Sequence, residues 1–173
     1  MTGIFVIAEL GGEIAARIHA VQQRFDPKLA AELPPHVTFI GSSGAGPVDA
    51  ATPVERLRRA MEPVAAATKP ISLRFGRPMR FIQREIVVLP LDPHGPARAL
   101  HERLKESGLS FAAARWPFTP HCTLSYYPTL TPVSLRQLLL VREDDPFTVS
   151  SLRVYLTSPP QRPTLLFDAP LSG

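Results

Sequence analysis

The chain of 173 residues contains a single cysteine, Cys122. One thiol cannot form a disulfide within the chain, and it cannot supply the several cysteines of a structural zinc site. Charged residues are also few, at 20% of the sequence, whereas hydrophobic residues reach 45%. This composition excludes an intrinsically disordered chain and supplies enough apolar side chains for a buried core.

Long hydrophobic runs are missing as well, since no apolar stretch reaches the roughly 18 residues that a membrane-spanning helix needs. The first residues lack the basic start of a secretory signal peptide, and Glu9 interrupts them before an apolar segment of signal length is complete. We therefore expect a soluble, cytoplasmic protein. A Gly-rich phosphate loop of the Walker or dinucleotide-binding type is also absent from the sequence.

Basic residues outnumber acidic ones, which gives a net charge of +4 and a pI of about 9.7. Most of the basic residues are arginine, which contacts phosphate through two parallel hydrogen bonds. This balance is compatible with a polyanionic substrate, but net charge alone does not identify a ligand. A central cluster is interpreted as a solvated hairpin surface rather than an RNA track: Arg74, Arg77, Arg80 and Arg84.

Hydrophobic periodicity, with glycine and proline as breaks, divides the chain into alternating strands and helices. The predicted strands cover residues 4–10, 36–40, 71–75, 86–91, 121–124, 147–156 and 164–167. The predicted helices cover residues 14–25, 53–64, 97–105 and a short segment around 135–139. Thr52 and Glu55 resemble a capping box at the start of the second helix.

The order of these elements occurs twice, as strand, helix, Pro-His-strand, helix and strand. Glu9 precedes His36 by 27 residues, and its expected counterpart Leu91 precedes His121 by 30 residues. The two histidines are 85 residues apart, a period too long for a solenoid. We therefore predict an α+β fold in which residues 1–173 form one duplicated domain, with two lobes related by a pseudo-two-fold axis.

One local pattern, Pro-His-apolar-Thr-apolar, occurs in both copies. It appears as Pro35-His36-Val37-Thr38-Phe39 and as Pro120-His121-Cys122-Thr123-Leu124. Because side chains alternate along a strand, His36 and Thr38 share one face, and His121 and Thr123 share one face in the other copy. A two-fold axis between the lobes would bring these polar faces together. Three histidines lack the pattern and are interpreted as surface or packing residues: His19, His94 and His101.

The residue types of this pattern suit acid–base chemistry on a phosphate. A histidine has an unperturbed pKa near 6.5, so one imidazole can be neutral while another is protonated at neutral pH. The neutral ring can take a proton from water or a hydroxyl, and the imidazolium can give one to a leaving oxygen. Threonine hydroxyls two residues further along can donate hydrogen bonds to phosphoryl oxygens. This chemistry requires no metal.

The two segments resemble those of the 2H phosphoesterase superfamily, and most closely its bacterial RNA 2′,3′-cyclic phosphodiesterase group, also called the 2′-5′ RNA ligase family. The matching stretches are residues 33–41 and 118–124, together with the opening strand and the helix after it. The resemblance implies a two-lobed fold with antiparallel sheets lining a central cleft and helices outside. It also implies metal-independent opening of a cyclic phosphate, or transfer at a 2′-5′ linkage. His36 and His121 then form the acid–base pair, with Thr38 and Thr123 as phosphate ligands.

The chain departs from the family pattern just after the second segment. Many members place Ala-Arg there, whereas this chain has Ser125-Tyr126, so an arginine contact to phosphate at that point is absent. Arg115 is the candidate that supplies the charge instead. Tyr126 and Tyr127 are candidates for stacking on a base, and Tyr127 is expected to share the face of Thr123 if the strand stays regular.

Three functions remain open at this stage. The first is a phosphodiesterase that acts as a monomer, without a cofactor, on RNA ends or on small cyclic nucleotides. The second is a non-catalytic module on the same fold that binds a nucleotide or an RNA end. The third is a histidine-based metal hydrolase, for which two histidines without clustered carboxylates are a poor ligand set. The acid and base roles of His36 and His121 also remain open.

Overall fold

The computed structural model describes residues 2–81, 84–127 and 130–173, which contain nine strands and five helices. The elements of the first half are β1 (Gly3–Glu9), α1 (Gly12–Phe25), α2 (Pro27–Glu32), β2 (His36–Ile40), α3 (Val54–Ala66) and β3 (Ile71–Leu73). Those of the second half are β4 (Met79–Arg80), β5 (Val87–Pro90), α4 (Pro96–Lys105), β6 (His121–Ser125), α5 (Pro132–Leu139), β7 (Phe147–Val149), β8 (Ser151–Thr157) and β9 (Thr164–Pro170).

A seven-stranded antiparallel sheet forms the centre of the molecule, with strand order β4-β5-β6-β2-β1-β8-β9. Its two parts meet where β2 pairs with β6, in a register that places Val37 opposite Cys122. A second, two-stranded antiparallel sheet consists of β3 and β7. The two central strands therefore come from equivalent places in the two copies of the duplicated pattern.

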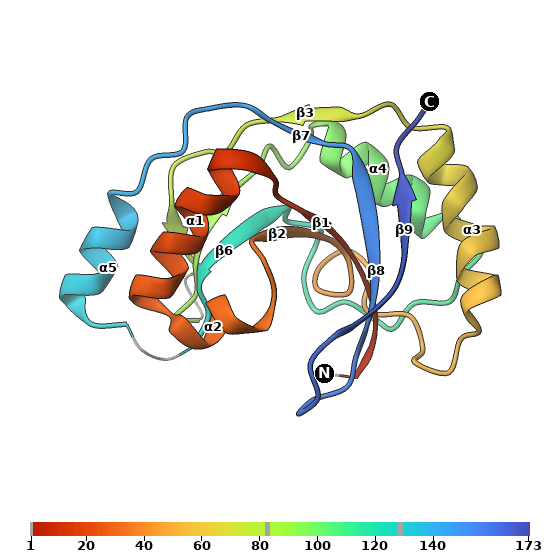
Figure 1. The fold of residues 1–173 in the computed structure, drawn as a ribbon, viewed down its shortest axis with the longest axis horizontal. Helices are drawn as coiled ribbons and strands as arrows, with labels where there is room; N and C mark the ends of the chain where they lie inside the picture. The colour runs from red at the N-terminus through yellow and green to blue at the C-terminus, as the bar shows by residue number, and fades with distance from the viewer. Residues whose placement is uncertain (1, 82–83, 128–129) are drawn as a thin grey trace.

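The helices are exchanged between the two parts of the sheet. Helix α1 follows β1 in the chain but packs against β6, and α4 follows β5 but packs against β2. Figure 1 shows α1, α2 and α5 on one side of the molecule and α3 and α4 on the other. This is the predicted α+β, duplicated, two-lobed arrangement, in which α1 and α4 each pack on a strand from the opposite half of the chain.

Apolar side chains at helical spacing explain why these helices dock on the sheet. The buried positions recur every three to four residues, which places them on one face of each helix. They are Ile14, Ile18 and Gln22 on α1, Leu57, Met61 and Ala65 on α3, and Ala97, Leu100, His101 and Leu104 on α4. Complete burial of a leucine or isoleucine side chain stabilises the fold by about 1.5–3 kcal/mol. No helix in the described part of the chain is long and apolar enough to cross a membrane.

Three details differ from the sequence predictions. The strand predicted over 147–156 breaks at Ser150, because β7 pairs with β3 whereas β8 pairs with β1. The prediction of a capping box at Thr52 is wrong. Pro53 is the N-cap of α3, in extended conformation, and no side chain caps the N-terminus of this helix. The short elements α2 and β4 were not predicted, since they are too brief to show a period.

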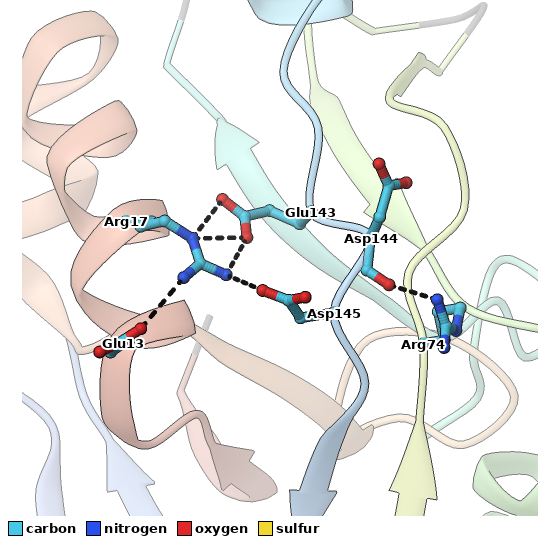
Figure 2. Close-up of polar contacts among 6 residues, drawn as sticks. All are labelled: Glu13, Arg17, Arg74, Glu143, Asp144 and Asp145. Carbon is cyan, nitrogen blue, oxygen red and sulfur yellow. Dashed lines mark hydrogen bonds and ion pairs between the residues drawn. The ribbon is translucent and has the colours of Figure 1, made fainter.

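The segment between α5 and β7 is fixed by two arginines (Figure 2). Arg17 on α1 donates from Nε and Nη2 to Oε2 of Glu143, at 3.0 and 2.8 Å, and from Nη2 to Asp145 at 3.0 Å. Arg74, which follows β3, donates to the backbone carbonyl of Asp144. Since the Glu143 side chain is only 4% exposed, the guanidinium of Arg17 compensates a buried charge. These contacts tie the approach to β7, in the second half, to α1 and to the end of β3 in the first half.

Candidate active site

The four residues of the His-x-Thr segments lie on one face of the central sheet. Val37 and Cys122, which pair with each other, are completely buried, so the residues on either side of each point to the opposite face. Antiparallel pairing about these two residues places His36 beside Thr123 and Thr38 beside His121. All four side chains are partly exposed: His36, Thr38, His121 and Thr123. We call this set the His-Thr quartet.

The spacing within the quartet follows from the strand geometry. Directly opposite residues of an antiparallel pair have Cβ atoms about 4.5–5.5 Å apart, and diagonal neighbours about 7–8 Å apart. The two histidines are diagonal neighbours, and so are the two threonines. Both imidazoles can therefore reach a small group bound between them. In the described residues, neither Thr38 nor Thr123 uses its hydroxyl in a hydrogen bond within the protein, which leaves both hydroxyls available to a ligand.

Each imidazole is oriented by a backbone carbonyl two residues earlier. Nδ1 of His36 lies 2.8 Å from the carbonyl oxygen of Pro34, and Nδ1 of His121 lies 2.7 Å from that of Thr119. Because a carbonyl only accepts, Nδ1 carries the hydrogen in both rings. The proton-exchanging atom of each histidine is therefore Nε2, and both rings have the same tautomer when neutral.

The strands beside the quartet repeat the same construction. In the first half, β1 places Glu9 opposite His36 and Ile7 opposite Thr38, with a register shift just before Ile7. In the second half, β5 places Pro90 opposite His121 and Val88 opposite Thr123, again with a shift just before the second pair. The register thus makes Pro90 the counterpart of Glu9, and the sequence pairing of Glu9 with Leu91 is wrong by one residue.

The exchanged helices hold the backbone of both strands. On α1, Gln22 donates from Nε2 to the carbonyl of Thr123 at 2.7 Å. On α4, Nδ1 of the buried His101 donates to the carbonyl of Phe39 at 2.7 Å, and its ring stacks on Phe118 with centroids 3.9 Å apart. Of the two roles predicted for His101, surface or packing, the structure shows packing, and Phe118 is buried against it. Each half of the chain supplies the polar side chain that fixes the other half's strand.

Burial governs the ionisation of the groups at the centre of the site. Desolvation lowers the pKa of His36 and of His121, which favours the neutral imidazoles. A positive charge on His36 lowers the pKa of His121 further, so the protonation of the two rings is coupled. Burial raises the pKa of the Cys122 thiol to about 12, so Cys122 remains protonated at neutral pH and cannot act as a thiolate nucleophile.

Two neighbours of the histidines were not predicted from the sequence. Glu9 lies on the cross-strand position next to His36, and its negative charge acts to raise the pKa of that ring. Phe81 contacts His121 edge-on, with ring centroids 5.2 Å apart and an interplanar angle of 87°. The only sequence signal for Glu9 is an acidic residue at the end of an apolar strand, which is a weak one.

The remaining candidates lie around the end of β6. Arg115 is exposed on the segment before β6, and in the described residues no ion pair or hydrogen bond joins its side chain to the quartet. Tyr126 is 51% exposed and meets the ring of Tyr127 edge-on at 5.2 Å. The hydroxyl of Tyr127 donates to Glu32, and Lys28 lies 4.0 Å from its ring centre.

The condition under which Tyr127 was expected to share the face of Thr123 is not met, because β6 ends at Ser125. There the backbone N–H groups of Tyr126 and Tyr127 donate to Oδ2 of Asp26, at 2.7 and 2.9 Å, instead of continuing the strand. Asp26 is 1% exposed, and its Oδ1 also accepts from the N–H of Leu29 at 3.0 Å. A buried carboxylate between α1 and α2 therefore fixes the chain just after the second His-x-Thr segment.

Within the described residues, the quartet is not part of a cluster of metal-binding side chains. Across residues 2–81, 84–127 and 130–173, no three histidine, cysteine, aspartate or glutamate side chains lie close enough together to hold an ion. The chemistry that the arrangement can perform is proton transfer at two imidazole Nε2 atoms, with two hydroxyl donors beside them.

A family model described as the 2′-5′ RNA ligase superfamily matches residues 11–158, which include both His-x-Thr segments. The chain belongs to the 2′-5′ RNA ligase superfamily. The family resemblance seen in the sequence is thereby confirmed. A comparison with curated proteins by sequence finds no match.

Solved structures of two other proteins share the whole fold of the chain. The Thermus thermophilus protein TT0787 has a TM-score of 0.68 at 19% identity, and the match covers 100% of this chain and 99% of that protein. E. coli LigT complexed with phosphate has a TM-score of 0.62 at 14% identity over 99% and 98% of the two chains. E. coli LigT complexed with 3′-AMP has a TM-score of 0.61 at 17% identity over 99% of each chain. At these identities the likeness establishes the fold.

Proposed function

We propose that this member of the 2′-5′ RNA ligase superfamily is a phosphodiesterase that opens 2′,3′-cyclic phosphates by acid–base catalysis from two histidines, without a metal. The proposed substrates are RNA ends or small cyclic nucleotides, and we expect the protein to act as a cytoplasmic monomer. The observation that carries the proposal is the His-Thr quartet, in which two imidazoles anchored through Nδ1 are diagonal neighbours on one sheet face. The complexes of E. coli LigT with phosphate and 3′-AMP support a ligand of this chemistry.

The proposed reaction is an attack of water on the cyclic phosphate. One neutral imidazole removes a proton from water through Nε2 while the water oxygen forms a bond to phosphorus. The bond between phosphorus and one ribose oxygen breaks, and the other histidine, as imidazolium, protonates that oxygen. The products are a phosphate monoester and a ribose hydroxyl, and solvent returns the two rings to their starting protonation states. Transfer at a 2′-5′ linkage would use the same groups, with a ribose hydroxyl in place of water.

The threonines have the second proposed role. In the quartet, Thr38 lies beside His121 and Thr123 beside His36, and both hydroxyls can donate hydrogen bonds to the non-bridging oxygens as negative charge increases on them. Arg115, Tyr126 and Tyr127 are proposed as weaker substrate contacts, with Tyr126 offering the most exposed ring for stacking on a base.

The test is hydrolysis of a panel of 2′,3′-cyclic nucleotides in EDTA, with products identified by phosphorus NMR. We expect turnover by the natural sequence, and a loss of about 10²–10⁴-fold in His36→Ala and in His121→Ala. His94→Ala is the matched control, because His94 is an exposed turn histidine outside the quartet, and its activity should not change. Full activity in either quartet variant would contradict the mechanism.

A binding module without turnover is the competing function, and Ser125-Tyr126 in place of the family's Ala-Arg is the observation that favours it. Calorimetry beside the product assay separates the two functions. Measurable affinity for a cyclic nucleotide with no product would establish the binding module and overturn the phosphodiesterase proposal.

A further inference from the structure

The two histidines have different cross-strand neighbours, although their own segments are built alike. The register places Glu9 next to His36 and Pro90 next to His121. Residues opposite each other in an antiparallel pair share a face, so the Glu9 side chain lies on the same side of the sheet as the quartet. Of the two candidate catalytic rings, His36 is therefore the one with a carboxylate at its cross-strand position.

Glu9 is held in place by β8. Its Oε1 accepts from the hydroxyl of Tyr155 at 2.6 Å, and its Oε2 accepts from Nη1 of Arg153. Nε of Arg153 also lies 3.1 Å from Oδ1 of Asp168 on β9. The Glu9 side chain is 14% exposed, so water screens its charge only in part. Arg153 thus contacts both Glu9 and Asp168, and of these two carboxylates Glu9 is the one at the cross-strand position of His36.

The charged and titratable groups around each ring can be named element by element. Glu9 faces His36 from β1, with Arg153 and Tyr155 on β8 beyond it, and His121 faces it from β6. Around His121, β5 contributes Pro90, the ring of Phe81 lies perpendicular to the imidazole, and His36 is the charged neighbour. Burial lowers the pKa of both rings, but Glu9 opposes this effect at His36, while His36 lowers the pKa of His121 further.

We propose that Glu9 is a positioning residue that gives the two histidines different roles: His36 carries the proton that is donated to the leaving oxygen, and His121 accepts the proton of the nucleophile. This proposal rests on the proposed phosphodiesterase function. The carboxylate stabilises imidazolium at His36, and that positive charge disfavours a second proton on His121. When the two histidines hold one extra proton between them, that proton is therefore on His36, the ring beside β1. It follows that the leaving ribose oxygen lies towards β1 and the attacking water towards β5.

The direct test is an NMR titration of the Cε1–Hε1 signals of His36 and His121. In the natural sequence we expect His36 to become protonated at the higher pH of the two. Glu9→Gln should move the titration of His36 to lower pH and bring the two curves closer together. Asp168→Asn is the matched control, because it removes a carboxylate that shares Arg153 but lies on β9, away from His36. An unchanged His36 titration in Glu9→Gln, or an equal shift in Asp168→Asn, would overturn the proposal.

The kinetic test is the pH profile of kcat/KM. Since protonated His36 is the proposed acid, its pKa sets the alkaline limb, and Glu9→Gln should move that limb to lower pH while the acidic limb stays in place. Above the limb we expect a loss of about three- to tenfold, most of it recovered in Glu9→Asp, which keeps the charge. A loss that is the same at every pH would show a merely structural role and would contradict the proposal. The NMR titration needs no turnover, so failure of the phosphodiesterase assay leaves the test of Glu9 intact.

Discussion

In the first half of the molecule, β2 lies beside β1 and its backbone is held by His101 of α4; in the second half, β6 lies beside β5 and is held by Gln22 of α1. The backbone hydrogen bonds before the two strands also correspond. The N–H of Leu10 donates to Pro35 and that of Leu91 donates to Pro120, both at 2.9 Å. The duplication therefore reproduces the backbone that positions each histidine.

The two halves differ in the side chains that surround this common backbone. His36 has a carboxylate as its cross-strand neighbour, whereas His121 has a proline there and the perpendicular ring of Phe81 beside it. Acid–base catalysis needs a proton donor and a proton acceptor at the same pH, so two identical rings in identical surroundings would be poorly suited to it. The comparison indicates that the duplication sets the geometry of the site. The neighbouring side chains make the surroundings of the two histidines different.

The two threonines offer the sharpest test of whether the two halves contact the phosphate in equivalent ways. We expect Thr38→Val and Thr123→Val each to lower kcat by about 10²-fold, because each removes one hydroxyl donor from the proposed transition state. Thr38→Ser and Thr123→Ser keep the hydroxyl and should retain most of the activity. Steady-state kinetics on a 2′,3′-cyclic nucleotide would measure this, and a large loss at one threonine with none at the other would show that the two halves do not share the phosphate.

Asp26 tests the anchoring of the backbone just after β6. We expect Asp26→Ala to lower the free energy of unfolding by about 2–3 kcal/mol, because it leaves the N–H groups of Tyr126 and Tyr127 without their buried carboxylate. Asp92→Ala is the control, since its carboxylate accepts one N–H in an exposed turn, and it should cost less than about 1 kcal/mol. Urea denaturation measures both, and equal costs would contradict the anchoring role of Asp26.

The smallest expected effect concerns His101 and its counterpart Gln22. Desolvation lowers the pKa of His101, so below about pH 6.5 the unfolded chain binds a proton that the folded chain does not. The free energy of unfolding should therefore decrease as the pH falls from about 7.5 to about 5.5. His101→Gln imitates Gln22 and cannot titrate, so it should weaken this pH dependence. Urea denaturation at both pH values tests this, and an unchanged slope would show that His101 does not contribute.

Much of the fold was predictable because the decisive signals are local. The strand predicted over residues 36–40 matches β2, and the helices at 14–25 and 97–105 match α1 and α4 to within two residues. The alternation around the two histidines also predicted which side chains face away from the core. Each of these features depends on a few neighbouring residues, so periodicity is sufficient to locate them.

The features that sequence reasoning missed are non-local. The end of β6 is decided by Asp26, which is 100 residues away from Tyr126 in the chain. The break at Ser150 is decided by the pairing of β7 with β3. The surroundings of Glu9 depend on Arg153 and Tyr155, which follow it by 144 and 146 residues. Residue spacing in the sequence cannot reveal such contacts. It also led to the prediction of Leu91 as the counterpart of Glu9, one residue away from Pro90.

The central claim is that His36 and His121 act on the same phosphoryl group, and ligand titration by NMR tests it most directly. Adding a nucleoside 2′-phosphate or 3′-phosphate, the two monoesters that ring opening could give, should shift the Cε1–Hε1 signals of both histidines with one common Kd, while the signal of the exposed His94 stays in place. Movement of only one quartet histidine, or two different Kd values, would contradict a shared phosphate.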